Sequence, residues 1–474
     1  MSDELLYLSA TELLDAYRSK RVSPVEVIDT VLARIQELQP TVNAFVTVCH
    51  DDARKTAQDA EAALSSGEGE GAIAGIPYSV KDLVPTKGVR TTFGSAVFGD
   101  NVPNHGSVAA ERLMGAGGVL LGKTTTPALG HKAVTTSLVS GVSRNPWNLE
   151  RTCGGSSGGA AAAVASGQGP LALGTDGGGS VRIPASACGI VGLKPTLGRV
   201  PQESAPDLFG TLSYIGPMTR TVADAALMLS VMAGPHASDP WSRGQPTLPD
   251  LSFPEVPSLP GNFKAAWFPL LGNSVIDDGV KRVVEGAVQS LSGLGLGVEP
   301  EEDMLEAGDA MWRAIGYSAQ YARMASHLDS TPDLIDPSLK TNMEEGMQIS
   351  GRDLQDGLFA RSNIYRAIEK VFEGFDLMIT PTLAAPPPVA DFDAHQDIEI
   401  GGTRAGKLRA AWYAYTHPFN MSGHPAITLP CGWTDDGLPA GIQLVAPWYR
   451  EDQLLRVAAA FEQENPWAHK RPGI

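Results

Sequence analysis

Apolar residues recur at helical spacing over the first part of the chain. Ser9 and Glu12 have the spacing of a capping box, and apolar residues follow them on one helical face. A second start signal, Ser23 followed by Pro24, precedes another amphipathic run, after which comes a stretch rich in alanine and charge. This pattern predicts that residues 1–66 form a group of N-terminal helices.

Farther along, short apolar runs of strand length alternate with stretches of helical spacing. The runs expected to be strands are 76–83, 119–121, 171–173, 377–380, 426–429 and 441–445. The stretches expected to be helices are 159–166, 223–233, 276–294, 302–327, 354–372 and 451–463. Because strands and helices alternate, the pattern predicts an α/β fold with a sheet covered by helices on both faces.

The composition changes near residue 235 without signalling a new domain. Residues 235–260 are rich in proline and polar side chains, which is typical of a surface excursion. We interpret the chain as one domain, with a catalytic core over 67–235, a mostly helical insertion over 240–375 and the rest of the core over 376–474.

Composition also limits the expected partners and location. The net charge of −17 over 474 residues makes nucleic acids and anionic membranes unfavourable partners. The four cysteines are widely spaced, which is typical of a reducing compartment, and no signal peptide or membrane span is evident. No residue spacing suggests a metal site. We therefore expect a cytoplasmic protein that needs no metal or cofactor.

The candidate chemistry lies in a glycine- and serine-rich stretch over residues 153–196. It places Ser156 and Ser180 on two separate glycine loops, and Gly177–Gly179 run directly into Ser180. Glycines leave backbone N–H groups open to a substrate, and a serine nucleophile needs such donors for the oxyanion that forms. The pattern predicts a serine nucleophile placed inside its own oxyanion hole.

Two other motifs match by spelling but lack the required context. Residues 117–124 fit the phosphate-loop formula, yet their apolar interior favours a buried strand over an open turn. The elbow pattern G-x-S-x-G occurs at 154–158 and 155–159, which would make Ser156 or Ser157 the nucleophile of a histidine-based hydrolase. No histidine downstream carries a supporting motif, so we regard both alternatives as weak.

The stretch over 153–196 resembles the defining motif of the amidase signature family, through GGSSGG, GTDGGGSVRIP and GLKPT in that order. Further blocks that resemble the family are GIPYSVKD, RNPWN, GPMTRTVAD, FDLMITPT, FNMSGHPAITLP and GLPAGIQLV, which together span nearly the whole chain. The resemblance implies a single domain with a central mixed, twisted sheet, and an amidase that uses a Ser-cisSer-Lys catalytic group.

By motif, the resemblance implies that Ser180 is the nucleophile, Ser156 the bridging serine and Lys81 the base. It also implies a cis peptide bond between Gly155 and Ser156. A lysine is a base only when neutral, so its pKa must fall from ~10.4, which burial can achieve.

The same resemblance implies an oxyanion hole made by the backbone N–H groups of Gly177, Gly178, Gly179 and Ser180. The neighbouring polar residues of the motif are expected to support the loops rather than to react, and these are Ser157, Thr175, Asp176 and Arg182. We expect a buried ion pair between Asp176 and Arg182.

Three positions distinguish this chain from the glutamyl-tRNA amidotransferase member of the family. In the glutamyl-tRNA amidotransferase member of this family, an acidic residue stands where this chain has Ala128, and an aspartate where it has Tyr413. That relative usually has threonine at the position of Gly177. These differences favour a stand-alone hydrolase over the amidotransferase alternative.

The candidate pocket segments 128–129, 209–215 and 412–413 are apolar and aromatic. They favour small aryl or alkyl amides, anilides or carbamates (urethanes) as substrates. The resemblance implies that esters are cleaved as well. Aliphatic and nylon-type amides stay open alternatives. The resemblance also makes a homodimer an expectation, since homodimers are common in the family.

Overall fold

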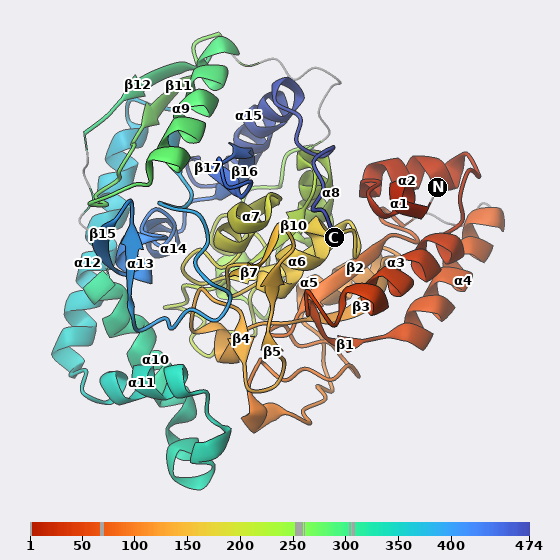
Figure 1. Ribbon diagram of the computed structural model, residues 1–474, viewed down its shortest axis with the longest axis horizontal. Coiled ribbons are helices and arrows are strands. Elements are labelled where there is room, and N and C mark those ends of the chain that lie inside the picture. Colours follow the sequence, from red (N-terminus) through yellow and green to blue (C-terminus); the bar gives the residue numbers. More distant parts are fainter. Residues whose placement is uncertain (1, 67–70, 252–258, 260, 303–304, 306–308) are drawn as a thin grey trace.

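The computed structural model describes residues 2–66, 71–251, 259, 261–302, 305 and 309–474. One sheet of eleven strands crosses the molecule (Figure 1). Its strands lie in the order β1 (Phe45–Val48), β3 (Val119–Thr124), β2 (Pro77–Lys81), β8 (Leu171–Asp176), β10 (Tyr214–Thr219), β9 (Val191–Lys194), β16 (Ala426–Trp433), β17 (Pro439–Val445), β13 (Leu377–Pro381), β11 (Lys264–Trp267) and β12 (Gly297–Pro300).

The sheet is mixed, as the resemblance implied. Strands β3, β2 and β8 are parallel near one edge, and β13, β11 and β12 are parallel at the other. All neighbouring strands from β8 to β13 pair antiparallel. Outside the sheet lie three small hairpins, β4–β5 (Thr136–Ser137, Gly141–Val142), β6–β7 (Arg144–Asn145, Asn148–Thr152) and β14–β15 (Asp397–Ile400, Thr403–Lys407).

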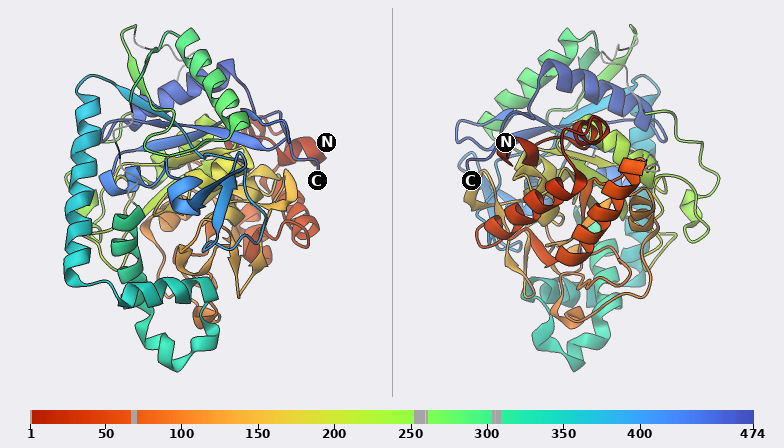
Figure 2. Two further views of the ribbon diagram at one scale, coloured as in Figure 1. Left: turned by 60° about the vertical axis from the view of Figure 1, so that its left-hand side comes forward. Right: turned by 90° about the vertical axis from the view of Figure 1, so that its right-hand side faces the viewer.

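Helices cover both faces of the sheet, which confirms the predicted α/β fold (Figure 2). One layer contains α6 (Gly158–Ala165) and α7 (Arg182–Cys188), and the other contains α5 (Val108–Gly115), α8 (Val222–Met232), α9 (Asp278–Gly293) and α15 (Glu451–Glu464). Beside these layers lie α10 (Asp309–Ser330), α11 (Pro337–Met347), α12 (Gly351–Phe372), α13 (Leu408–Ala411) and α14 (Pro418–Ser422). The short 3₁₀ helices are η1 (Ala96–Phe98), η2 (Ala128–Gly130), η3 (Pro240–Ser242) and η4 (Pro332–Leu334).

Four helices form within residues 2–66, and between the last two of them the short strand β1 joins the central sheet. The helices are α1 (Ser2–Leu6), α2 (Ala10–Arg18), α3 (Pro24–Leu38) and α4 (His50–Ser66), on the right of Figure 1. Ser9 and Glu12 form a reciprocal capping box at the start of α2. The Ser23 hydroxyl caps α3, with Pro24 in the first turn.

The segment 240–375 contains the helices α9 to α12, and it also adds two strands, β11 and β12, to the central sheet. Both strands have only four residues, and β11 contains two alanines, so local propensity carries no strand signal. Pairing with the distant strand β13 decides their conformation. Part of the predicted helix over 302–327 and of the excursion over 235–260 lies outside the described residues, as do residues 67–70 of the predicted core.

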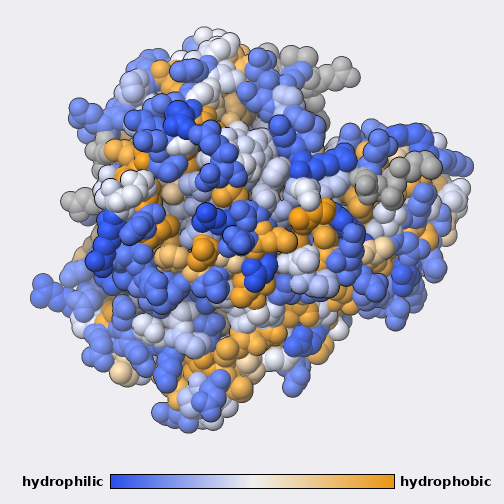
Figure 3. Space-filling view, viewed as in Figure 1, coloured by the Kyte–Doolittle hydropathy of each residue, from blue (hydrophilic) through white to orange (hydrophobic). Residues whose placement is uncertain are grey.

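In the described part of the chain, no helix is both long and apolar enough to cross a membrane. The face drawn in Figure 3 is mostly hydrophilic, with hydrophobic residues in small groups between polar ones. Scattered apolar residues of this kind are normal on a protein surface.

Helix α6 approaches the sheet so closely that only small residues fit. Every residue of the helix is buried, and all are glycine, alanine or valine. A Cβ atom added to Gly159 would lie 2.2 Å from Thr125 Oγ1 and 2.6 Å from the Ala44 carbonyl oxygen. Such separations are far below van der Waals contact, so glycine lets the loop before α6 reach strands β2 and β3.

We expect Gly159→Ala to destabilise the protein by about 1–3 kcal/mol, because the added methyl group forces backbone atoms apart. The measurement is the midpoint of thermal unfolding. Gly286→Ala on α9 is the matched control, since nothing lies within 4 Å of its added Cβ atom. Alanine should leave that midpoint unchanged or raise it, and a similar loss in both variants would contradict the packing explanation.

Candidate active site

Lys81 ends in a fully buried cluster of hydroxyl groups. Its side chain is 0% exposed, and Nζ lies within hydrogen-bond distance of Ser156 Oγ at 2.8 Å, Ser157 Oγ at 2.8 Å and Thr175 Oγ1 at 2.9 Å. A longer contact of 3.3 Å reaches the Thr175 carbonyl oxygen. The structure therefore brings together the predicted base, the predicted bridging serine and two of the residues expected only to support the loops.

Strand order explains why these side chains meet. Strand β2 lies between β3 and β8 and is parallel to both, with Val80 opposite Leu173, so the ends of β2 and β8 are neighbours. Lys81 is the last residue of β2, and Ser156 precedes α6, which packs on the same strands. The Gly155–Ser156 peptide bond is cis, as the resemblance implied.

The environment of Lys81 favours its neutral form. Burial lowers the pKa of the Lys81 amine well below its ordinary value, and the nearby Asp176 carboxylate offsets part of that effect. Removing water disfavours the charged ammonium, and the serine and threonine hydroxyls around it carry no charge to replace the solvent. A lysine in this state can accept a proton.

Ser180 lies on the glycine loop that follows β8, and it is only half-buried. The Ser157 backbone N–H donates to the Ser180 carbonyl oxygen at 3.1 Å, which joins the two glycine loops directly. No hydrogen bond between the Ser156 and Ser180 hydroxyls is present in the described part of the structure. Such contacts often tighten only when substrate is bound.

A buried ion pair supports the Ser180 loop, as expected. Arg182 donates to both carboxylate oxygens of Asp176 at 3.0 Å, and both side chains are 0% exposed. Burial alone would raise the pKa of the Asp176 carboxyl, but the Arg182 charge, together with hydrogen bonds from Arg182 and Asn420, holds that pKa below its usual range. Arg182 also donates to Gln443 Oε1 at 2.7 Å and to the Thr416 carbonyl oxygen at 2.8 Å.

The same carboxylate changes the expected oxyanion hole. The Gly179 N–H donates to Asp176 Oδ1 at 2.7 Å, so this amide holds the loop together and is not free to bind a substrate oxygen. The N–H groups of Gly177, Gly178 and Ser180 have no acceptor among the described residues. These three amides are the donors that the geometry leaves available.

Several site residues were missed by the sequence analysis. Gly130 has φ +69°, and a Cβ atom there would lie 3.0 Å from Ser156 Oγ. Asn420, Thr416 and Trp312 each donate a side-chain hydrogen bond to a backbone carbonyl of the Ser180 loop. The block FNMSGHPAITLP contains Asn420 and could have drawn attention to it. The other three sit in segments without a motif.

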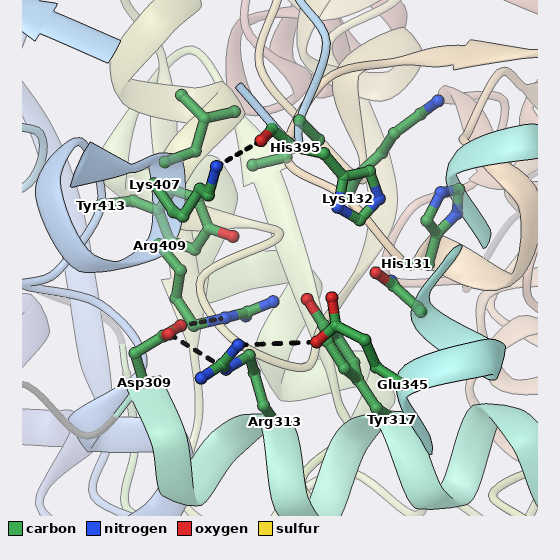
Figure 4. A pocket seen from close by; sticks show the side chains of 14 residues that line it. His131, Lys132, Asp309, Arg313, Tyr317, Glu345, His395, Lys407, Arg409 and Tyr413 are labelled. Atoms are coloured by element: carbon green, nitrogen blue, oxygen red, sulfur yellow. Dashed lines mark hydrogen bonds and ion pairs between the residues drawn. The ribbon is translucent and has the colours of Figure 1, made fainter. Parts of the chain in front are cut away.

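A pocket lies near the glycine loops, and Figure 4 shows the side chains that surround it. The side chains around it are mostly charged or polar, and they belong to His131, Lys132, Ala133, Asp309, Arg313, Tyr317, Asn342, Glu345, Ala394, His395, Lys407, Leu408, Arg409 and Tyr413. Two of these residues connect the pocket to the loops. Ala133 backbone atoms lie 2.8–3.1 Å from a Cβ atom placed on Gly155, and Arg409 Nη1 lies 3.7 Å from one placed on Gly178.

This pocket differs in its lining from the apolar pocket that the sequence predicted, which stays a prediction. Of the three candidate segments, only Tyr413 lines the pocket. Ala128 and Trp412 are buried in the interior, and Phe209 is 74% exposed on the surface. Charged side chains from α10, α11 and β15 take their place, because tertiary packing brings these distant elements to the pocket.

Most of the residues 117–124, which match the phosphate-loop motif, form the buried strand β3, as their apolar interior indicated. Lys123 is 0% exposed and donates to Thr86 Oγ1 at 2.8 Å and to the Val84 carbonyl oxygen. Its amine is therefore engaged inside the protein and is not placed to bind a phosphate.

The histidine-based alternative finds no support in the geometry. None of the nine histidines, all of which lie in described parts of the chain, hydrogen-bonds to Ser156, Ser157 or Ser180. Of the two histidines of the pocket wall, His131 contacts the Ala128 carbonyl oxygen and Ser338 Oγ, and His395 contacts the Ser338 carbonyl oxygen. The position that a histidine base would need is occupied by Lys81.

Comparison with known proteins identifies the class. Residues 26–455 match the protein family described as Amidase. The chain therefore belongs to the amidase signature family, and it is an amide-hydrolysing enzyme.

Individual relatives include an acylamidase of Rhodococcus erythropolis, 37% identical over 99% of this chain and 98% of that protein. A glutamyl-tRNA(Gln) amidotransferase subunit of Symbiobacterium thermophilum is 34% identical over 98% of this chain and 99% of that protein. Among solved structures, a bacterial aryl acylamidase of the amidase signature family has a TM-score of 0.89 at 30% identity, covering 98% of this chain and 97% of that one. The 6-aminohexanoate cyclic dimer hydrolase has a TM-score of 0.87 at 31% identity, covering 99% of both chains.

We expect Asp176→Asn to destabilise the fold by about 3–5 kcal/mol, because it leaves the Arg182 charge buried without a counterion. Chemical denaturation of both proteins measures the difference. Asp435→Asn is the matched control, since it removes a carboxylate from the exposed pair with Arg282 and should barely change stability. Equal denaturation midpoints for Asp176→Asn and wild type would contradict the supporting role of this ion pair.

Proposed function

We propose that this enzyme hydrolyses small acylamides through an acyl-enzyme on Ser180, with Ser156 as the proton relay and Lys81 as the base. One observation carries the proposal, namely the fully buried Lys81 amine at 2.8 Å from Ser156 Oγ on a loop joined to that of Ser180. A neutral amine held at this distance from a serine hydroxyl is an effective base.

The hydrogen bonds around Lys81 suit a neutral amine. A neutral amine has two N–H groups and one lone pair. The Ser157 hydroxyl donates to the Thr175 carbonyl oxygen at 3.1 Å, so its own oxygen is free to accept from Lys81. Thr175 Oγ1 accepts the second N–H at 2.9 Å. The lone pair is then left for the Ser156 hydroxyl proton.

In the proposed reaction, Ser180 Oγ attacks the amide carbonyl carbon. Its proton passes to Ser156 Oγ while the Ser156 proton passes to the Lys81 amine. When the C–N bond breaks, the proton returns along the same route to the leaving nitrogen, which must be protonated to depart. Water then attacks the acyl-enzyme through the same relay, which releases the acid and restores Ser180.

Negative charge develops on the carbonyl oxygen during both steps. We propose that the N–H groups of Gly177, Gly178 and Ser180 bind it, without Gly179, whose N–H is bonded to Asp176. Each such donor is typically worth about 10²–10³ in rate. Glycine at 177 and 178 keeps side chains away from the substrate.

For the substrate class, we propose acylamides that carry an aryl or polar amine part, with anilides and aryl carbamates as first candidates. Similarity to an acylamidase and to an aryl acylamidase supports this class. The pocket offers the rings of Tyr317 and Tyr413 beside the Arg409 guanidinium, a combination that suits an aromatic ring with polar substituents.

The amidotransferase alternative is less well supported by the pocket. Tyr413 lines the wall where the amidotransferase relative has an aspartate. The two pocket carboxylates, Asp309 and Glu345, are already paired with Arg409 and Arg313. A glutamine amino group would thus lack a free carboxylate partner, and we propose a stand-alone hydrolase.

The cytoplasmic location, the homodimer and the division of the domain into core and insertion stay predictions from the sequence. Light scattering on the purified enzyme measures the oligomeric state directly.

We expect Ser180→Ala, Ser156→Ala and Lys81→Ala each to reduce kcat/KM for an anilide and for a matched aryl carbamate by at least about 10³-fold. Removing any member of one relay stops proton transfer. Ser186→Ala is the matched control, because its buried hydroxyl has no partner and lies outside the site. Full activity of Lys81→Ala would contradict the mechanism, and inactivity of wild type on both substrates would contradict the substrate class.

The pH profile should report the lowered pKa of Lys81. Protonated Lys81 cannot act as a base, so kcat/KM should rise with pH and level off well below ~10.4, the ordinary lysine pKa. Burial lowers the pKa of Lys123, a second buried lysine, to about 7. The variant Lys123→Met should keep the wild-type pH profile. If kcat/KM no longer depended on pH in this variant, the titrating group would be Lys123 and not Lys81.

A further inference from the structure

Three successive carbonyl groups of the Ser180 loop are held by side chains from distant parts of the chain. Asn420 Nδ2 donates to the Asp176 carbonyl oxygen at 2.8 Å, Trp312 Nε1 to that of Gly177 at 3.3 Å, and Thr416 Oγ1 to that of Gly178 at 2.8 Å. For the Gly177 carbonyl, Trp312 is the one hydrogen-bond donor that the described residues provide.

Each of these contacts also fixes the direction of an N–H group. A trans peptide unit is planar, and its N–H points opposite to its C=O. Holding the Gly177 carbonyl toward Trp312 therefore turns the Gly178 N–H the other way. Because glycine flanks this peptide on both sides, it can rotate at little steric cost, and an external anchor is needed to keep one orientation.

Trp312 is itself held firmly. The Arg409 guanidinium stacks 3.5 Å above the centre of its ring, and Arg409 Nε pairs with Asp309 at 3.2 Å (Figure 4). Gly316, one turn farther along α10, makes room for the ring, because a Cβ atom there would lie 2.5 Å from Trp312 Cζ3. The indole is buried, with 9% of Trp312 exposed.

We propose that Trp312 is a positioning residue for the oxyanion hole, which holds the Gly177–Gly178 peptide so that the Gly178 N–H faces the reacting carbonyl oxygen. This inference rests on the proposed function, in which that N–H is one of three donors. Because Trp312 lies on α10, the segment 240–375 would then orient a catalytic N–H group in addition to lining the pocket.

The variant Trp312→Phe tests the inference, because it removes the indole N–H but keeps an aromatic ring under Arg409. We expect kcat for the anilide to fall by about 10- to 100-fold, somewhat less than for loss of a whole donor. KM should change by less than about 3-fold, since the lost interaction acts mainly in the transition state.

A second readout separates this role from a general loss of structure. Phenylboronic acid forms a bond between boron and Ser180 Oγ, the serine proton passes into the relay, and the product is a tetrahedral anion. Its affinity should fall in Trp312→Phe by about the same factor as kcat. Gly316→Ala keeps the indole but displaces its ring, so it should lower both kcat and the affinity for phenylboronic acid. The control Trp241→Phe replaces a tryptophan that lies outside the site and should change neither.

If wild type binds the boronic acid and Ser180→Ala does not, the result supports Ser180 as the nucleophile independently of Trp312. If Ser180→Ala binds as well as wild type, the proposed function fails. If that control behaves as expected but Trp312→Phe keeps wild-type kcat, the positioning role is overturned. It is also overturned if kcat falls while boronic acid affinity stays unchanged in a folded variant.

Discussion

A lysine amine without water, held at hydrogen-bond distance from a serine, is the constraint on which the rest of the structure depends. Lys81 stays neutral only if solvent is excluded and the nearby Asp176 carboxylate, which raises the pKa of the lysine, is balanced by Arg182. The fold meets that requirement by placing β2 between two parallel neighbours and by covering its end with α6. The small residues of α6 follow from the same need, because larger ones would hold the serine loop away from the lysine.

The carboxylate that acts on the buried Lys81 amine, Asp176, belongs to a buried ion pair. Asp176 and Arg182 neutralise each other, and the remaining hydrogen-bonding groups of Arg182 are taken by Asn420, Gln443 and the Thr416 carbonyl oxygen. A buried pair that is fully hydrogen-bonded costs less than either charge alone. It also holds together the beginning of the Ser180 loop and the C-terminal part of the sheet, which are far apart in the chain.

The pocket and the catalytic loops follow different rules. The loops are built from glycine, serine and backbone amides, and their geometry depends on close approach. The pocket is lined by long charged side chains of α10, α11 and β15, and Arg313 of α10 pairs with Asp309 of the same helix and with Glu345 of α11. Changes in those side chains can alter which amide is accepted without disturbing the relay, whereas changes in the loops act on the chemistry itself.

The sequence alone determined the α/β class, the N-terminal caps at Ser9 and Ser23, and the identity of Lys81, Ser156 and Ser180 as the candidate group. Helical and strand periods are local, and the family motif is continuous over most of its length, so both can be found without a structure. Tertiary structure decided the two short strands of the segment 240–375, the use of the Gly179 N–H and the charged lining of the pocket. Most of these features arise from contacts between residues far apart in the chain, such as those of β11 with β13, and no local pattern records which side chains will meet. The Gly179 N–H instead bonds to Asp176, three residues away, in a loop that the distant Asn420 side chain holds.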